Sequence, residues 1–415
     1  MNLIFRGASI ATLVWIGTIL KPKIQEVGLF RSISNLHNER CSRVDGLEAC
    51  EDIFVDQPTG LAYLACSRRK DRAHWLPAMN VLRYQKLHGR SLDYIALLDL
   101  KTLEYRRLEL TNLPELLLQD GIHVHGLDLF VHPEEPIEPA ETESESTPPR
   151  KATIYLINHR SPYDDDTRAA GTADSVIEVF ETTIGSDKAT HQRTVKHNLV
   201  VTPNNLVALN ENSFYVTNDH RRKKHWTRDL ELFFLDSALD SIVHCSFNEE
   251  SVQCISALHG HHQFPNGIAK GPGNTIYMAN SLNAHLRLLE IQPDNTLILK
   301  DEFKVPRVID NLYVTSTGAV FIASIPSMPK FQAVLGELHK DTHSLVSPSE
   351  VWKFSNQTGT GSWQSKRIEL EKVFADDGKQ VTCTTGVAVW NSKLLMTGIA
   401  SPYLSICEVD QTIAS

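Results

Sequence analysis

A pattern of paired β-strands recurs along almost the whole chain. In each unit, an apolar stretch is followed by a Gly, Asn or Asp turn and then by a stretch rich in Val, Ile, Tyr and Phe. Units of short strands spaced roughly 45 to 80 residues apart are typical of a β-propeller. The sequence therefore predicts an all-β fold, a six-bladed β-propeller, with six units: GLAYLACS (60–67), HGLDLFVHP with ATIYLINH (125–133 and 152–159), NLVALNENSFYVTND (205–219), NGIAKGPGNTIYMANS (266–281), NLYVTSTGAVFIAS (311–324) and GVAVWNSKLLMTGIA (386–400).

The length and composition agree with one large propeller. The chain has 415 residues, of which 41% are hydrophobic and 22% charged, and propellers of this size fold as one unit. We expect residues 23–415 to form a single propeller. The segment 133–151 is rich in Pro, Glu, Ser and Thr and is predicted to be a disordered surface insertion. A net charge of −9 argues against a nucleic-acid partner, because phosphate binding requires a basic face.

The N-terminal residues 1–22 have the pattern of a targeting segment. Arg6 precedes an uncharged run, residues 7–20, which Lys21 and Lys23 close. The run is short for a membrane span and has the length of a signal-peptide core. We predict a signal peptide or a retained signal-anchor, and hence a secreted protein or one associated with a membrane through this segment. A buried helix or strand of the core is the alternative.

Seven cysteines are present, without the spacing of a zinc site. Cys41 precedes the first unit and Cys407 lies in the last strand, so a disulfide between them would close the ring and contribute on the order of 4–5 kcal/mol. Two buried free thiols are the alternative. The pairing of the other five is left open by the sequence: Cys50, Cys66, Cys245, Cys254 and Cys383. The triplet Asn356-Gln357-Thr358 is a candidate glycosylation site.

Polar residues stand at the start of the inner strand in five of the units. A single Asx residue there is ordinary turn chemistry, but a repeated set at equivalent places suggests a shared site at the mouth of the channel. Most of the set carries carboxylate or amide oxygens and none is Cys, which favours a hard cation, Ca²⁺ over Mg²⁺. The residues are Glu51-Asp52, His125, Asn204-Asn205, Asn266 and Asp310-Asn311.

The chain resembles the serum paraoxonase/arylesterase family, which comprises calcium-dependent six-bladed propellers that hydrolyse lactones and esters. The matching segments lie in order between about residue 41 and residue 410, so the resemblance covers nearly the whole predicted propeller. They are GLEACEDIFVDQPTGLAYLACS, VHGLDLF, IYLINH, PNNLVAL with FYVTNDH, FPNGIA, VIDNLYV and YLSICEV.

The resemblance implies two calcium ions, one catalytic and one structural. The catalytic ion would be held by Glu51, Asn204, Asn266, Asp310 and Asn311. The structural ion would be held by Asp52, Asn205 and the backbone carbonyl of Leu127. It also implies a catalytic dyad, His125 with His159, and the disulfide Cys41–Cys407. One departure is that Asn205 stands where the family usually has Asp, which removes a negative charge from the structural site.

Three functions remain open at this stage. The first is a calcium-dependent hydrolase of small lactones or aryl esters, in which the ion polarises the carbonyl group and His125 activates water. The second is a propeller without catalysis, which calcium stiffens and whose rim binds a partner. The third is a metal-free relative, similar to strictosidine-synthase-like proteins, which the oxygen-bearing set argues against. The run HGHHQF (259–264) could bind a transition metal but is better interpreted as a polar loop.

Overall fold

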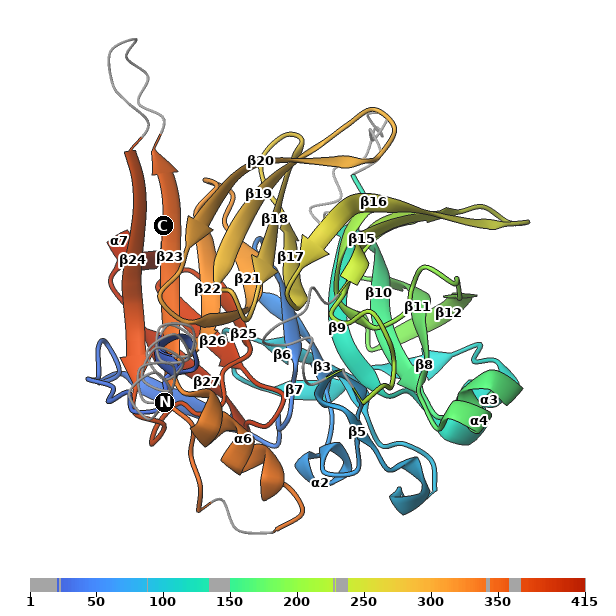
Figure 1. The fold of residues 1–415 in the computed structure, drawn as a ribbon, viewed down its shortest axis with the longest axis horizontal. Helices are drawn as coiled ribbons and strands as arrows, with labels where there is room; N and C mark the ends of the chain where they lie inside the picture. The colour runs from blue at the N-terminus through green and yellow to red at the C-terminus, as the bar shows by residue number, and fades with distance from the viewer. Residues whose placement is uncertain are drawn as a thin grey trace, which may run out of the picture.

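Six sheets form the blades of a six-bladed β-propeller in this computed structural model, which confirms the predicted fold (Figure 1). The structure describes residues 21, 24–87, 89–133, 150–226, 228, 238–340, 344–357 and 367–414. The innermost strands are β2, β9, β13, β17, β21 and β25, and each contacts the next around a closed ring. In Figure 1 the colours follow the chain from blade to blade, and the blue first segments meet the red last blade.

The first three blades each begin at the channel and run outward. The first contains β2 (Asp52–Asp56), β3 (Leu61–Cys66), β6 (Tyr94–Asp99) and β7 (Tyr105–Arg107). The second contains β9 (Val124–Val131), β10 (Lys151–Arg160), β11 (Asp174–Thr183) and β12 (Lys188–Val195), with β8 (Glu109–Thr111) parallel at its edge. The third contains β13 (Pro203–Asn210), β14 (Ser213–Asn218), β15 (Ala238–Phe247) and β16 (Val252–His262).

The last three blades follow the same order. The fourth contains β17 (Pro265–Lys270), β18 (Thr275–Asn280), β19 (His285–Ile291) and β20 (Leu297–Lys304). The fifth contains β21 (Val308–Val314), β22 (Val320–Ile325), β23 (Ser349–Gln357) and β24 (Arg367–Asp376). The sixth contains β25 (Gly386–Trp390), β26 (Lys393–Thr397) and β27 (Tyr403–Glu408), and β1 (Cys41–Asp45) completes it.

Short elements lie in the connections between strands and at the end of the chain. The helices are α2 (Arg69–Arg72), α3 (Glu115–Asp120), α4 (Asp165–Ala170), α6 (Met328–Gly336) and α7 (Gln411–Ala414), and the 3₁₀ turns are Pro77–Met79 and Tyr84–Lys86. A two-strand ribbon pairs β4 (Trp75–Leu76) with β5 (Val81–Leu82). Among the helices of the described residues, none has the length and hydropathy to cross a bilayer. Apart from Lys21, the targeting segment 1–22 lies outside the described residues, as do nearly all of the insertion 133–151 and the side chain of Asn356.

The ring is closed by strands from both ends of the chain. Strand β1 pairs antiparallel with β27, and Cys41 lies opposite Cys407 in that register. A disulfide joins these two residues, the pairing that the resemblance implies. Two further disulfides are present: Cys50, just before β2, is joined to Cys66 in β3, and Cys245 in β15 is joined to Cys254 in β16. Cys383 is a buried free thiol.

The core lies between the blades, so the middle strands are apolar on both faces. In β3, Ala62, Leu64 and Cys66 pack against the sixth blade. The alternate residues Tyr63 and Ala65 pack against the second blade. A strand whose two faces both meet a neighbouring sheet reads as a continuous apolar run, which explains the sequence LAYLAC.

Irregular pairing at the start of three inner strands changes the direction of the polar side chains that lie at the channel. The ladder register shifts between Pro203 and Leu206, between Pro265 and Ile268, and between Ile309 and Leu312. A bulge interrupts the alternation of side chains between the two faces of a sheet and re-aims the residues within it. Each of these shifts spans a polar pair singled out in the sequence, or Asn266 with its glycine.

Glycines let the inner strands approach one another at the same level. A Cβ atom on Gly126 would lie 2.7 Å from the carbonyl oxygen of Asn204 and 2.9 Å from the Cα of Asn205. A Cβ atom on Gly267 would lie 2.6 Å from the Cα of Asn311. Both contacts are too short for any side chain, so these glycines bring the polar pairs of adjacent blades together.

Candidate active site

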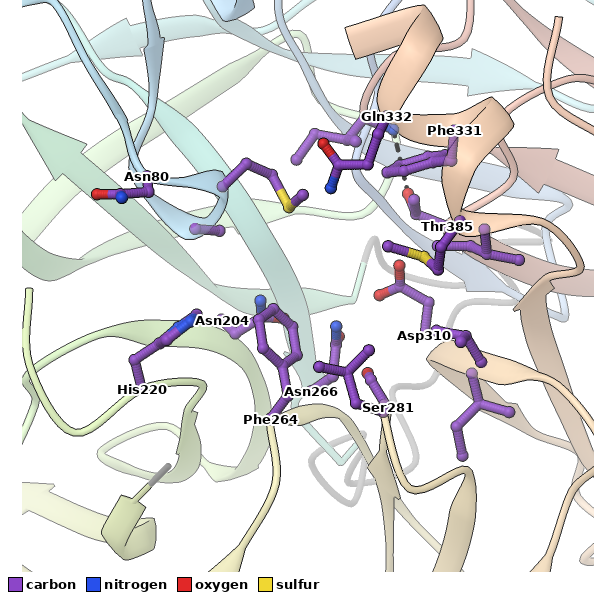
Figure 2. Close-up of a pocket in the computed structure, with 18 of the residues that line it drawn as sticks. Asn80, Asn204, His220, Phe264, Asn266, Ser281, Asp310, Phe331, Gln332 and Thr385 are labelled. Atoms are coloured by element: carbon purple, nitrogen blue, oxygen red, sulfur yellow. Dashed lines mark hydrogen bonds between the residues drawn. The ribbon is translucent and has the colours of Figure 1, made fainter. Parts of the chain in front are cut away.

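A cavity of about 530 Å³ opens at one end of the channel. Its polar floor is contributed by the starts of four inner strands: Glu51, Asn204, Asn266 and Asp310. His125, at the start of a fifth inner strand, lines the cavity beside this floor. Figure 2 shows Asn204, Asn266 and Asp310 around one end of the space, with Phe331 and Gln332 of α6 on another side. The structure therefore brings together residues that are up to 259 positions apart in the chain (310 − 51).

Three oxygen atoms of this floor are buried and unused. The Oε2 of Glu51, the Oδ1 of Asn204 and the Oδ1 of Asn266 have no hydrogen-bond partner among the described residues. They come from three different blades and line the same cavity. Buried polar atoms normally have hydrogen-bond partners. Three unpaired oxygens in one cavity therefore indicate a binding site for a cation or a hydrogen-bond donor.

The orientation of Asn204 is set by a neighbour behind it. Its Nδ2 donates to the Oδ2 of Asp219 at 3.3 Å. Because an ionised carboxylate can only accept, this contact assigns the nitrogen end of the amide and leaves the oxygen end for the cavity. The Asp219 carboxylate also accepts from the Nδ1 of His220 at 2.8 Å, and the nearby His220 and Arg228 hold the pKa of Asp219 below its ordinary value.

Two carboxyl groups of the floor have raised pKa values. Burial raises the pKa of Glu51 well above its ordinary value, and the charges of Asp52 and Asp310 raise it further. Burial likewise raises the pKa of Asp310, against the opposing effect of a hydrogen bond from Asn266. Two desolvated carboxylates facing one cavity favour a bound positive charge, which would offset both their burial and the repulsion between them.

A second polar layer lies behind the floor and does not line the cavity. It contains Asp52, Asn205 and Asn311, from blades one, three and five. The Nδ2 of Asn205 donates to the Oδ2 of Asp52 at 3.0 Å and to the Oδ1 of Asn311 at 2.6 Å. The Nδ2 of Asn311 donates in turn to the Oε1 of Glu51 at 2.8 Å. The side chain of Asn205 therefore extends from blade three to partners on blades one and five, across the centre of the ring.

The two layers differ in whether they fit a cation. The floor offers one free carboxylate oxygen, from Glu51, and two free amide oxygens, from Asn204 and Asn266, and the Asp310 carboxylate lines the same space. This donor set is suited to calcium. In the inner layer every amide hydrogen and both carboxylate oxygens of Asp52 are hydrogen-bonded, and Leu127 presents its N–H to Asp52 at 3.0 Å. Asn311, which the resemblance assigns to the catalytic ion, belongs to this inner layer. Across the described residues, no three His, Cys, Asp or Glu side chains gather as a metal-binding group.

The two histidines of the implied dyad lie in contact beside the floor. The ring centroids of His125 and His159 are 5.0 Å apart, at an interplanar angle of 61°. His159 is held by the hydroxyl of Ser175, 2.9 Å from its Nδ1, and its carbonyl accepts from the indole of Trp75 at 2.7 Å. Burial lowers the pKa of His125 well below its ordinary value and that of His159 to about 3, so both rings are neutral at neutral pH.

The sequence left several buried charged groups near the site without a role. In the sequence, Asp219 and His220 stand out only as part of the matching segment FYVTNDH, to which no role was assigned. Arg228 also lines the cavity, and its Nη2 donates to the carbonyl of Pro77 at 2.8 Å. Arg72 is buried behind the floor, where its charge lowers the pKa values of both Glu51 and His125. No spacing or local pattern distinguishes such arginines from surface ones.

The walls of the cavity are mostly apolar. They come from the first-blade connection around Met79, from the connections beside β17 and β21, and from α6. The side chains that form them include Met79, Phe264, Leu282, Met328, Phe331 and Ile399. Small-molecule sites commonly combine apolar walls with a few polar groups that fix the orientation of the ligand.

The run 259–264, considered above for a transition metal, reaches this cavity at its end, where Phe264 lines the wall. His259 is on β16, is largely exposed, and has Ser256 and Asp240 as its polar neighbours at 3.1 and 3.8 Å. The interpretation of the run as a polar loop is wrong for residues 259–262, which belong to strand β16, where His262 is buried.

Comparison with known proteins gives both family and fold relatives. The model of the arylesterase family matches residues 163–408, more than half of the 415 residues. Serum paraoxonase/arylesterase 2 of Bos taurus is 24% identical over 369 residues, which cover 88% of each chain. Serum paraoxonase/lactonase 3 of Oryctolagus cuniculus is 22% identical over 400 residues, covering 93% of this chain and 94% of that protein.

Among solved structures, a gluconolactonase of Xanthomonas campestris superimposes with a TM-score of 0.45. Its sequence is 10% identical, and the match covers 93% of this chain and 97% of that one.

Proposed function

The chain belongs to the arylesterase family, and from that premise we propose that it is a calcium-dependent hydrolase of lactones or aryl esters. The observation that carries the proposal is the floor of the cavity. Three buried oxygens without a partner in the described chain face a space with apolar walls, where two carboxyl groups have raised pKa values. A cation and an uncharged organic substrate would together satisfy both parts of this cavity.

The residues that would hold the ion are those of the floor: Glu51, Asn204, Asn266 and Asp310. When bound, calcium supplies a Lewis acid that polarises the carbonyl oxygen of the substrate. Asp219 holds the amide of Asn204 with its oxygen toward the cavity. Asn311 supports Glu51 from behind through its Nδ2, so that the other carboxylate oxygen of Glu51 stays free. These contacts preorganise the donor oxygens before any ligand arrives.

His125 is the proposed general base. It lines the cavity and its lowered pKa keeps the ring neutral at neutral pH, the state in which an imidazole accepts a proton from water. His159 does not line the cavity, but it contacts His125 and is itself anchored by Ser175 and Trp75. Its proposed role is to orient His125 and to receive the proton onward, away from the substrate.

The apolar walls would receive the organic part of the substrate, which favours lactones and aryl esters over charged or strongly polar esters. The polar floor would then meet only the reacting carbonyl group. The disulfides in the structure and the serum relatives support a protein of the secretory pathway. Glycosylation at Asn356 and membrane association through the N-terminal segment are further parts of this proposal.

The test is hydrolysis of a small panel by the purified protein, with aliphatic δ- and γ-lactones beside phenyl acetate. We expect activity with calcium, loss on chelation and recovery when Ca²⁺ is restored. The order of the rates would rank lactones against esters. If calcium raises the melting temperature while no member of the panel is hydrolysed, the enzyme proposal is wrong and the alternative of a calcium-stabilised binding propeller replaces it.

A further inference from the structure

We propose that the inner layer of the channel holds no calcium ion, because the side-chain nitrogen of Asn205 takes the place of the second cation that the resemblance implies. The proposal concerns Asp52, Asn205 and Leu127, the residues implied for a structural ion. The expected total of one calcium ion per chain rests on the proposed function, in which the cavity floor binds that ion. The hydrogen bonds of the inner layer do not depend on the proposed function.

The orientation of the Asn205 amide is the first step. Its Oδ1 accepts from the backbone N–H of Leu206 at 2.7 Å. A backbone N–H can only donate, so the oxygen end of the amide is identified by this contact and the NH₂ group must face the other way. That group points at two acceptors, the Oδ2 of Asp52 and the Oδ1 of Asn311. A metal ligand would present its oxygen there instead.

The acceptors around this nitrogen are already used, which is the second step. The Oδ1 of Asp52 accepts from the N–H of Ile53 at 2.9 Å. Its Oδ2 accepts from the N–H of Leu127 at 3.0 Å as well as from Asn205. Each hydrogen of the Asn205 amide has one acceptor, and the Asp52 carboxylate accepts three hydrogen bonds. A cation at this place would meet the positive ends of N–H dipoles and would have to break the network.

The backbone of Asn205 is also held in place. The hydroxyl of Thr217 lies 3.1 Å from both the N and the O of Asn205, and 2.8 Å from the carbonyl oxygen of Asn266 on the next blade. Gly126 allows β9 to come close to Asn205 on the other side. The amide is therefore clamped between blades, so turning its oxygen toward the centre would cost these contacts.

The charge of the layer explains why an amide can replace an ion. Two carboxylates about 3 Å apart repel strongly and need either a shared proton or a cation between them. An Asn at position 205 leaves only the carboxylate of Asp52 and supplies hydrogen atoms to it. The layer then needs no divalent charge to hold the three blades together.

The experiment measures bound calcium by mass spectrometry of the dialysed full-length protein, together with the melting temperature in calcium and in chelator. We expect one tightly bound calcium ion per wild-type chain. Glu51→Gln, which removes a charge from the floor and keeps a side-chain oxygen that can accept from Asn311, is expected to retain none. Two ions in the wild type, or one ion that survives Glu51→Gln, would overturn the proposal.

The converse variant is Asn205→Asp, which places a second carboxylate beside Asp52. We expect it to bind one calcium ion more than the wild type and its melting temperature to become more sensitive to chelation. Asn212→Asp, the same change on an exposed turn, and Asn205→Ala, which removes the amide without adding charge, should gain none. An Asn205→Asp protein that folds and gains no ion contradicts the inference.

The two proposals fail in different ways. The wild type could bind no calcium while Asn205→Asp binds one ion. This result would support the inference about the inner layer and would show that the floor does not bind calcium. If Asn205→Asp does not fold, the ion counts of the wild type and of Glu51→Gln still decide the matter.

Discussion

Asn204 and Asn205 are neighbours in the chain and present opposite ends of the same amide group to the channel. In Asn204 the nitrogen is tied back to Asp219, and the oxygen is left free in the cavity. In Asn205 the oxygen is tied back to the N–H of Leu206, and the nitrogen faces Asp52 and Asn311. The first is suited to a cation and the second to the acceptors around it.

The same division applies to the other adjacent pairs. Glu51 and Asp310 belong to the floor, whereas Asp52 and Asn311 belong to the inner layer. A residue type and its position along the chain therefore do not decide whether it binds metal. The decision lies with the group behind each side chain, because that group determines which atoms remain unused.

The largest effect is expected from Glu51→Gln, which removes one charge from the floor and keeps its shape. We predict the loss of tight calcium binding and a fall in kcat/KM on the order of 10³-fold, since the ion would no longer stabilise the developing oxyanion. Lactone hydrolysis and metal content are measured side by side. Glu250→Gln, on an exposed turn, is the control, and a Glu51→Gln enzyme with unchanged rate and calcium would remove Glu51 from the site.

His125→Gln separates proton transfer from cation binding. His125 lines the cavity but belongs to neither layer of donor oxygens, so we predict a fall in turnover of roughly 10²-fold with the bound calcium retained. Kinetics and metal analysis of the same preparation provide the test. His259→Gln, at an exposed site on β16, serves as the control. Wild-type turnover in His125→Gln would exclude the dyad.

Asp219→Asn tests what holds Asn204. The carboxylate of Asp219 accepts from both Asn204 and His220, and an amide in its place can accept with only one of its two end atoms. The Asn204 oxygen should then be less well oriented, and calcium affinity should fall by about tenfold. Calcium titration checks this against Asp294→Asn, the same change on an exposed turn. Equal affinity would show that Asn204 needs no support from Asp219.

The smallest effect concerns stability and pH in the absence of calcium. Because burial and the charges of Asp52 and Asp310 raise the pKa of Glu51, the folded protein binds this proton more tightly than the unfolded chain. Above the ordinary value of 4.5, the wild type therefore loses stability relative to Glu51→Gln as pH rises. We predict that the variant melts higher in chelator, by a gap of a few degrees that widens from about pH 4.5 to 7.5. A constant gap across this range would contradict the prediction.

Much of the architecture was open to prediction from the sequence. The strand pairs of 60–67, 205–219 and 266–281 identified the blades because short β-rich segments separated by turns leave few alternatives. The polar residues at the inner-strand starts could be singled out for the same reason. Arg72 and Arg228 could not, because a buried arginine has no periodic pattern and its burial depends on loops that fold over the propeller.

By itself, the sequence determined the all-β class, the number of blades and the set of polar residues that reach the channel, since these depend on local propensity and on repetition. Only the tertiary structure decided how the set divides into a floor and an inner layer. Register shifts at Asn204-Asn205 and Asp310-Asn311 re-aim adjacent side chains, and Gly126 and Gly267 set how closely the blades approach. Which end of an amide remains unused depends on partners from other blades, and no local stretch of sequence contains them.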